Sequence, residues 1–320
     1  MSPDLHPVYV DGNALAVRCI YGSVREEITN ALPFTGGIYS TINTLASILQ
    51  HHRVHAGVVA AFFDHDPPPW RVKLLPGYKS ARREVETMFE SEEQRLAVFA
   101  QIGQVFRLLP LLGVVSLCHR EREADDGVAA ATRVSLARRE VPLVVTSDRD
   151  LWQVVSWGAR VWDLKTGEII DAANFFQFAG CSPDTYLLFK ALVGDASDNI
   201  TGAHGLGPVR AAELLERAHW DVRLAREPLD QLKSLCRFIR DQEKPSKAEL
   251  GVIRDRKRLA RVIRGIDLRA SFGRRRALAA RLASPPPVRG VEFGRACARL
   301  GIRGAHPHLT RPYAQARGRL

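Results

Sequence analysis

Short apolar runs that end at an acidic residue recur through the first half of the chain. The runs and the acids that follow them are Val8 to Val10 with Asp11, residues 57 to 63 with Asp64, and Leu143 to Val145 with Asp148 and Asp150. Short runs that are apolar throughout are typical of strands buried on both faces of a parallel sheet. The carboxyl ends of such strands meet at one edge, where α/β proteins bind ligands. One aspartate there is usually a turn or cap residue, but three in register favour a functional site.

Helical patterns fill the intervals between these runs. Residues 38 to 50 carry apolar side chains at helical spacing, and an alanine-rich helix is expected to begin near residue 124. The alternation of strand and helix predicts an α/β fold with a doubly wound, mainly parallel sheet. Residues 211 to 270 are helical by pattern. We therefore expect an α/β domain over residues 1–180, with Val161-Trp162 as its last strand, a helical domain over 181–283, and an extension over 284–320.

Three further acids, Glu123, Asp125 and Asp126, stand at the start of the alanine-rich helix. A helix dipole tolerates acids in its first turn, so each has a structural explanation on its own. With Asp148 and Asp150 they place five carboxylates around one helix and one strand. Such a group repels itself unless cations neutralise it, and Mg²⁺ or Mn²⁺ prefers an all-oxygen site. The pattern predicts a divalent-metal site.

Composition excludes several classes of protein. The 320 residues are 46% hydrophobic, which is normal for a packed globular core. The N-terminus has no basic-then-apolar signal pattern, and no apolar run approaches the ~18 residues of a membrane span, so we expect a cytoplasmic protein. The five cysteines are scattered without a C-x-x-C pair, so we expect reduced, mostly buried thiols and neither zinc nor disulfides.

Basic charge is concentrated at the C-terminal end. The net charge is +11, and residues 251–320 hold 18 of the 46 Lys and Arg residues but three of the 35 Asp and Glu residues. An acid-centred body with a basic end suits a polyanion that needs metal at one point and phosphate contacts elsewhere. The alternative is a basic tail that only aids solubility. Residues 284–287 are expected to form a stiff linker or a turn, and the chain beyond about residue 301 is expected to be partly disordered.

Residues 70 to 83 combine five basic residues with Trp70 and Tyr78 and contain no acid. Aromatic rings stack on bases while Lys and Arg hold phosphates, so the segment has the composition of a single-strand contact. A solvated basic loop is the alternative. The helical pattern of residues 85 to 112 is too long for a compact connection, which favours a lid or arch over the site.

A glycine-rich turn follows the sheet-forming half. Asp195 and Asp198 lie on a turn that Asx chemistry explains, while Gly205, Gly207 and Pro208 open a helix with free backbone N–H groups. The pattern is similar to the hairpin of a helix-hairpin-helix element, which grips a duplex backbone without reading its sequence. An ordinary Gly-Pro helix start is the alternative.

Six motifs occur in a specific order between about residues 8 and 215. They are V-D-G at 10–12, F-D at 63–64, G-Y-K-S-A-R at 77–82, E-A-D-D at 123–126, T-S-D-R-D at 146–150 and G-D-A-S-D-N-I-T-G-A-H-G-L-G at 194–207. This order resembles the 5′-nuclease family, which comprises the 5′→3′ exonuclease domain of bacterial DNA polymerase I and stand-alone flap endonucleases. The resemblance implies a PIN-like α/β fold with a helical arch at about residues 70–112 and a helix-hairpin-helix at about residues 194–216.

The resemblance also implies roles for individual residues. Ligands of one divalent ion would be Asp11, Asp64, Glu123 and Asp125, with Asp126 beside them, and ligands of a second would be Asp148, Asp150, Asp195 and Asp198. The catalytic Lys79 and Arg82 would neutralise the scissile phosphate, and the DNA contacts would be Tyr78, Arg83, Gly205, Gly207 and Arg210. A monovalent cation such as K⁺ would bind backbone carbonyls of Gly202, His204 and Gly207.

The implied activity is structure-specific cleavage of DNA at 5′ flaps and 5′ ends by a two-metal mechanism, giving 5′-phosphate and 3′-hydroxyl products. We expect a stand-alone bacterial or phage enzyme because no polymerase domain follows. It would be a nucleoid-associated monomer, would act on flapped, gapped or nicked duplex and on RNA–DNA hybrid, and would have a functional link to DNA polymerase and ligase in primer removal and repair.

Two alternatives stay open. A PIN-type ribonuclease would share the acids but would not need the basic-aromatic segment or the hairpin. A non-catalytic junction-binding protein would need the hairpin but has no use for nine matched acids.

Overall fold

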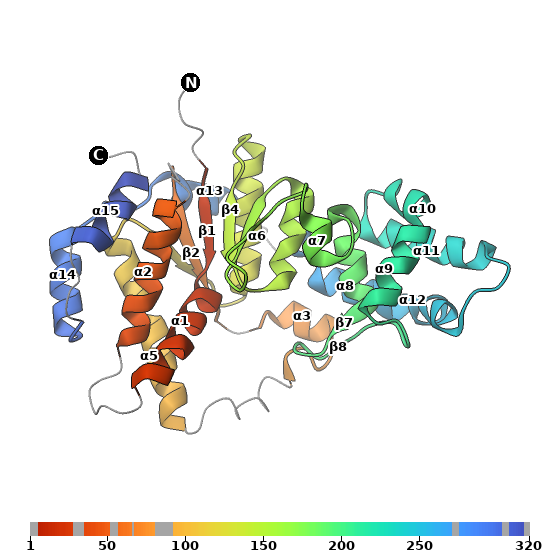
Figure 1. The fold of residues 1–320 in the computed structure, drawn as a ribbon, viewed down its shortest axis with the longest axis horizontal. Coiled ribbons are helices and arrows are strands. Elements are labelled where there is room, and N and C mark those ends of the chain that lie inside the picture. The colour runs from red at the N-terminus through yellow and green to blue at the C-terminus, as the bar shows by residue number, and fades with distance from the viewer. Residues whose placement is uncertain are drawn as a thin grey trace.

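A computed structural model describes residues 6–27, 35–51, 57–65, 67–80, 92–270, 275–302 and 307–316. The molecule is elongated, with a helix-covered sheet at one end and a helical body at the other (Figure 1). None of the helices in these ranges combines the length and the apolar character that a bilayer crossing requires.

A six-stranded sheet has the strand order β3-β2-β1-β4-β5-β6. The strands are β1 (Val8–Asp11), β2 (Val59–Phe63), β3 (Val115–Cys118), β4 (Leu143–Thr146), β5 (Arg160–Asp163) and β6 (Ile169–Ile170). The first five run parallel and β6 pairs antiparallel at the edge. The strands expected at residues 8–10, 57–63, 143–145 and 161–162 are therefore present.

Two edge strands escaped the sequence pattern. β3 was not predicted because Ser116 interrupts its apolar run and its last residue, Cys118, is exposed at the sheet edge. The expectation that Val161-Trp162 lies in the last strand is wrong, because the two-residue β6 follows it. Both strands have too few buried positions to show a strand pattern.

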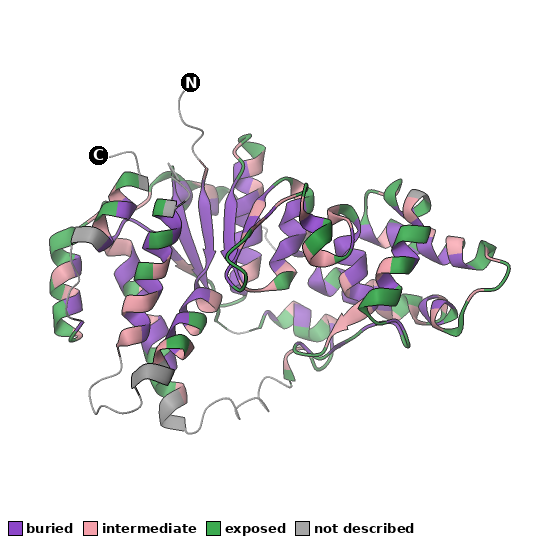
Figure 2. Cartoon of the chain, in the orientation of Figure 1, coloured by how far each residue is buried: buried purple, intermediate pink, exposed green. Residues whose placement is uncertain are grey.

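Helices cover both faces of the sheet. The elements are α1 (Gly12–Glu27), α2 (Gly36–His51), α3 (Pro69–Leu74), α5 (Glu92–Leu108), η2 (Leu109–Leu111), α6 (Ala124–Ala137) and η3 (Arg149–Trp157). Val10, Ala61 and Val145 pack in the cluster that includes α1, α2 and α5, whereas Tyr9, Ala60 and Val144 pack in the cluster that includes α6. This alternation explains why the central strands are buried along their whole length (Figure 2).

The segment predicted as an arch is described in part. Its start is the short helix α3, and residues 81–91, with Arg82 and Arg83, lie outside the described residues. Its later part is α5, whose Val98, Ile102 and Val105 are buried in the same core as α1 and α2. An arch that crosses the site therefore stays a prediction, and α5 belongs to the helical layer on the sheet.

The second half of the chain builds the helical body. Its elements are α7 (Phe175–Ala179), η4 (Pro183–Thr185), α8 (Tyr186–Val193), β7 (Gly194–Asp195), β8 (Ile200–Thr201), α9 (Pro208–Arg217), α10 (His219–Arg223), α11 (Pro228–Asp241), α12 (Lys247–Ile266) and η5 (Leu268–Ala270). α8, the β7–β8 hairpin and α9 are arranged as helix, hairpin and helix over residues 186–217, which begins before the expected range of about 194–216. One hydrophobic core runs from α6 into this body.

The basic C-terminal segment folds back onto the first domain. It forms α13 (Arg275–Ala283), α14 (Gly290–Arg299) and α15 (Pro307–Ala316), which lie at the sheet end of the molecule (Figure 1). The expectation of disorder beyond residue 301 is wrong for α15, because Leu309 and Tyr313 are buried and the Tyr313 hydroxyl donates to the Ile42 carbonyl at 2.8 Å. This helix was not predicted because the segment has few apolar residues and several arginines, so it shows no clear helical spacing of apolar positions.

Candidate active site

Three strand ends bring predicted acids to one edge of the sheet. β2, β1 and β4 are parallel neighbours, so Asp64, Asp11 and Asp148 follow one another along their carboxyl ends. Asp125 joins them from the first turn of α6. Burial first, and then repulsion from the other three, holds the pKa of Asp125 well above its usual range. We call these four carboxylates the acid edge.

The acid edge is hard to ionise without a cation. Loss of hydration, followed by repulsion from Asp64, raises the pKa of Asp11 to about 7. Loss of hydration, followed by repulsion from Asp150, raises the pKa of Asp148 to about 6. A divalent ion would remove the repulsion, and an all-carboxylate set fits Mg²⁺ or Mn²⁺. Within the described ranges, no group of three Asp, Glu, His or Cys side chains is already arranged to hold a metal ion. The assignment of the acid edge as a metal site therefore rests on the chemistry of its oxygen donors and on its charge.

Hydrogen bonds hold these acids in place. The Asp11 carboxylate accepts from the Ala14 N–H at 2.9 Å and the Thr146 hydroxyl at 3.0 Å. Asp64 accepts from the Ala124 N–H at 2.7 Å, which ties the end of β2 to the N-terminus of α6. Both acids are therefore turn or cap residues and members of the acid edge at once.

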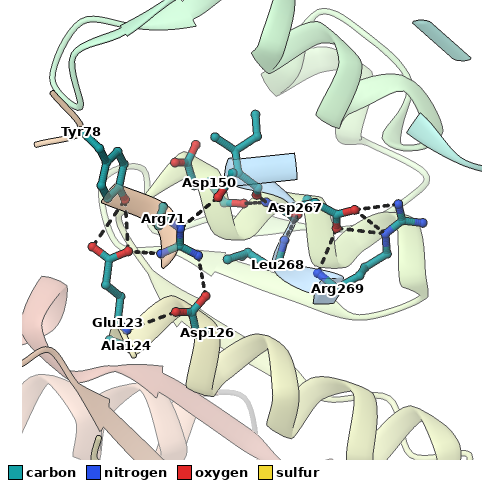
Figure 3. A network of polar contacts seen from close by, with 12 residues as sticks. Arg71, Tyr78, Glu123, Ala124, Asp126, Asp150, Asp267, Leu268 and Arg269 are labelled. Atoms are coloured by element: carbon teal, nitrogen blue, oxygen red, sulfur yellow. Dashed lines mark hydrogen bonds and ion pairs between the residues drawn. The ribbon is translucent and has the colours of Figure 1, made fainter. Parts of the chain in front are cut away.

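The buried Arg71 engages the other two acids of the E-A-D-D motif (Figure 3). One guanidinium nitrogen pairs with Glu123, and another donates to Asp126 at 2.6 Å, while Nε donates to the Gly265 carbonyl on α12 at 2.9 Å. Asp126 is fully buried and also accepts from the Glu123 N–H at 3.2 Å. Asp126 is thus committed to Arg71 and to its own helix start, which separates it from the acid edge.

Tyr78 and Lys79 reach the same site from the predicted arch base. The Tyr78 hydroxyl donates to Glu123 at 3.1 Å, and the Lys79 ammonium pairs with the same carboxylate. Lys79 has a φ of 56°, and its N–H donates to the Asp198 carbonyl at 3.0 Å. The Asn199 side chain donates to the Gly77 carbonyl at 3.0 Å. The hairpin region therefore fixes the backbone that carries Lys79.

Lys190 links the remaining predicted ligands. Its ammonium lies 2.8 Å from Asp150 and 3.0 Å from Asp195. Burial disfavours its charge, but Asp150 outweighs burial and raises the pKa of Lys190 above its usual range. Asp198 is buried nearby and adds to the repulsion that acts on Asp148. Sequence reasoning missed Lys190 and Arg71, although a single Lys inside the apolar run of α8 was a usable signal.

In the turn where a K⁺ ion was expected, backbone carbonyls contact the side chain of Arg258 instead. The Arg258 guanidinium donates to the Gly202 carbonyl at 2.7 Å, contacts the Thr201 carbonyl as well, and pairs with Asp255 at 2.8 Å. The Gly202 carbonyl, one of the three expected K⁺ ligands, therefore already accepts from a protein cation in this arrangement. Gly202 has no room for a side chain, because a Cβ would lie 2.3 Å from the Leu192 carbonyl oxygen.

The expected DNA contacts of the hairpin are exposed. Gly205 turns the chain with a φ of +77°, and Gly207 precedes α9. Both glycines and Arg210 are open to solvent, and Arg210 donates to the Gly205 carbonyl at 3.3 Å. His204 is exposed on the same turn. The hairpin thus presents backbone and one guanidinium at the surface.

A mainly parallel sheet with carboxylates along its carboxyl edge, joined to a helix-hairpin-helix, is the architecture that the motifs predicted. The family model described as "5'-3' exonuclease, N-terminal resolvase-like domain" matches residues 6–180. The chain belongs to this 5′-3′ exonuclease family, so the resemblance drawn from the motifs is confirmed.

Relatives support the same assignment. A "5'-3' exonuclease" of Mycoplasma pneumoniae is 31% identical over 219 residues, which is 66% of this chain and 71% of that protein. DNA polymerase I of Deinococcus radiodurans is 29% identical over 214 residues, which is 65% of this chain and 20% of the polymerase.

Solved structures show the same fold. The 5′-exonuclease of bacteriophage T5 with bound zinc has a TM-score of 0.65 at 18% identity, covering 98% of this chain and 99% of that one. A T5 flap endonuclease complex with DNA and metal ions has a TM-score of 0.66 at 18% identity, covering 97% of this chain and 99% of that one. These structures confirm the predicted fold, and the family assignment identifies the chain as a nuclease.

Proposed function

We propose that the chain is a divalent-metal-dependent nuclease that cuts DNA at 5′ flaps and trims 5′ ends, leaving 5′-phosphate and 3′-hydroxyl. The observation that carries this proposal is the acid edge beside Lys79. Lys79 lowers the cost of ionising both Asp125 and Asp148, which puts one cationic side chain next to a cluster of carboxylates of which Asp11 is buried and Asp125 and Asp148 are partly buried. Such a pair of features suits a metal and the phosphate that it binds.

The proposed ligands of the divalent ions remain those implied by the motifs. They are Asp11, Asp64, Glu123 and Asp125 for one ion, with Asp126 beside them, and Asp148, Asp150, Asp195 and Asp198 for the other. A bound Mg²⁺ or Mn²⁺ supplies a water of lowered pKa and positive charge for the phosphate oxygens. Arg71 engages both Glu123 and Asp126, and Asp126 is the less accessible of the two because its side chain is fully buried.

The chain's own cations would position the phosphate. Lys79 pairs with Glu123 and lies 5.2 Å from the centre of the Tyr78 ring, so an arriving phosphate would compete with Glu123 for its ammonium group. Arg82 would add a second positive charge from the predicted arch. Charge neutralisation of this kind is worth several kcal/mol where water is excluded. Lys190 would keep Asp150 and Asp195 close together while they are ionised.

The proposed substrate is flapped, gapped or nicked DNA, with RNA–DNA hybrid as a further substrate. Gly205, Gly207 and Arg210 would contact the duplex backbone, and Tyr78 and Arg83 the single strand. The Arg258 guanidinium would take the place of a K⁺ ion in the hairpin. We further propose a monomeric enzyme of the cytoplasm that follows a DNA polymerase and precedes a ligase in primer removal and repair.

The product of one reaction tests this function. A 5′-labelled flap, a nicked duplex and a single-stranded RNA are each incubated with Mg²⁺, Mn²⁺ or EDTA, and product lengths and end groups are read. The proposal predicts metal-dependent cutting near the flap junction with 5′-phosphate ends. Cutting of RNA in preference to the flap would favour a PIN-type ribonuclease, and flap binding without cutting in either metal would favour a junction-binding protein.

A further inference from the structure

A basic groove lies between α11 and α12, outside the site described above. It has a volume of about 480 Å³, and its lining contains six basic residues and no acid. The basic residues are Lys233, Arg237 and Arg240 on α11, and Arg256, Lys257 and Arg264 on α12. We call this surface the α11–α12 groove.

Helical spacing aligns these side chains into two rows. On α11 the basic residues recur at intervals of four and three, which places them on one helix face. On α12, Lys257 and Arg264 are two turns apart, and Arg261 lies between them on the same exposed side. Buried Leu232 and Cys236 contribute to the lining between the rows. The groove is therefore an apolar floor between two cationic walls.

Few carboxylates balance this charge. Lys233 pairs with Asp230 at 2.8 Å, and Asp255 is occupied by Arg254 and Arg258 on another side of α12. Within the described ranges, none of the other five groove cations forms an ion pair with a carboxylate. Like charges this close repel one another, so the groove favours an anion with several negative charges.

The position of α12 indicates which anion this is. Arg258 braces the hairpin from the middle of α12, and Gly265 near its end accepts from Arg71 of the active site. Arg256 and Arg264 are eight residues apart, which is about 12 Å along a helix. A row of cations on this scale matches successive phosphates of one strand better than it matches a single small anion.

We propose that the α11–α12 groove holds the phosphate backbone of the substrate duplex, as a contact separate from the hairpin and the metal site. This inference rests on the proposed function, because it assumes that the substrate is DNA. Contacts to phosphates fix the position of a protein on a duplex without reading its sequence. The groove would thus extend the DNA path along the helical body.

Salt dependence of binding provides the test. The triple variant Arg237→Gln, Arg256→Gln, Arg264→Gln is compared with Arg295→Gln, Arg299→Gln, Arg311→Gln, which removes three exposed arginines from α14 and α15 at the other end of the molecule. Affinity for a flapped duplex is measured without divalent metal over a range of KCl concentrations. The groove variant should show a shallower slope of log K against log salt, by about 0.9 for each lost phosphate contact, and the control should keep the wild-type slope.

Equal slopes in all three proteins would overturn the proposal. So would an unchanged DNA slope combined with lost binding of a poly-glutamate peptide, which would assign the groove to an acidic protein segment. Circular dichroism checks that each variant keeps its helices. Flap cutting by the wild type with Mg²⁺ is measured in parallel, because a failure there would contradict the proposed function itself, whatever the slopes show.

Discussion

Arg71 is the residue on which three parts of the site converge. It is 3% exposed and binds Glu123, Asp126 and the Gly265 carbonyl through different guanidinium nitrogens. The guanidinium also lies 4.8 Å from the centre of the Trp70 ring. The planar guanidinium group has donors in fixed directions that reach these three acceptors at once, whereas the ammonium group of a lysine does not match their geometry. Arg71 is therefore a positioning residue that sets the start of α6.

Arg71→Lys keeps the charge and removes the fork, so one buried acid loses its partner. We expect a loss of about 1–3 kcal/mol in the free energy of unfolding, measured by urea denaturation. The single-turnover cutting rate should fall while flap affinity is kept, because Glu123 would lose its fixed orientation. Arg138→Lys, at an exposed site, is the matched control and should change neither quantity. If Arg71→Lys and Arg138→Lys change the stability and the cutting rate equally, Arg71 is not a positioning residue.

Asp11 gives the metal-free protein a specific pH dependence. Burial and Asp64 raise the pKa of Asp11 from its ordinary 3.8 to about 7, so the folded state prefers the protonated acid. The stability that this preference contributes is complete below the ordinary value and is lost as pH rises through about 7. In EDTA, the melting temperature should therefore fall between about pH 5 and pH 7.5.

Asp11→Asn should flatten that fall, because an amide does not titrate. Adding Mg²⁺ at pH 7.5 should raise the melting temperature of the wild type more than that of the variant. Parallel melting curves for the two proteins across this pH range, with equal shifts on adding Mg²⁺, would show that Asp11 does not control the stability of the acid edge.

The sequence predicts the acid edge but misses the cations that surround it. Asp11, Asp64 and Asp148 could be found because a buried parallel strand has a clear apolar pattern and its end has a known place in the fold. Arg71 could not be found, because its partners Glu123, Asp126 and Gly265 are far away in the chain. Lys190 showed only as a single Lys within the apolar run of α8. Their pairing depends on how α3 and α8 pack against the sheet.

At the scale of elements, the hairpin is braced by a side chain. Arg258 bonds to the Gly202 carbonyl and is itself held by Asp255, so α12 supports the turn between β8 and α9. Replacing KCl by NaCl at equal ionic strength should therefore leave duplex affinity unchanged in the wild type. Arg258→Met should weaken binding and make it stronger in K⁺ than in Na⁺, measured by fluorescence anisotropy. A strong preference of the wild type for K⁺ would show that an ion, and not Arg258 alone, supports the turn.

Elements with a regular apolar pattern were predicted well. α2 matches the helical spacing of residues 38 to 50, and β4 matches the run from residue 143. β3 was missed because half of its residues face outward at the sheet edge. The residue pattern of α5 was read as an arch, since a buried helix and a free one can share a period and differ only in what they pack against.

At the scale of the whole molecule, the basic C-terminal residues divide between two places. Those on α12 belong to the helical body, and those on α14 and α15 lie at the sheet end (Figure 1). The tail is fixed by buried Phe293, Cys297 and Tyr313 and by the Arg289 N–H, which donates to the Leu111 carbonyl at 2.6 Å. Composition alone suggested a single basic end, because it does not show that the C-terminal helices pack back against the first domain.

Truncation after Ser284 should therefore act on stability. It removes large apolar side chains, each of which contributes about 1.5–3 kcal/mol when fully buried, so the free energy of unfolding in urea should fall by several kcal/mol. Tyr313→Phe is the milder comparison and should cost about 1 kcal/mol, because it removes the hydrogen bond to Ile42 alone. A truncated protein of wild-type stability with a much shallower salt slope for DNA would instead make the tail a phosphate contact.

We propose that the acid edge is the metal-dependent catalytic centre. The most direct test is the single-turnover rate of Asp148→Asn on a 5′-labelled flap with Mg²⁺, measured beside its affinity for the same flap. The rate should fall by on the order of 100-fold or more, because a ligand of the metal is lost. Affinity should be kept or increase, because one negative charge near the phosphates is removed. A near-normal rate would remove Asp148 from the catalytic site.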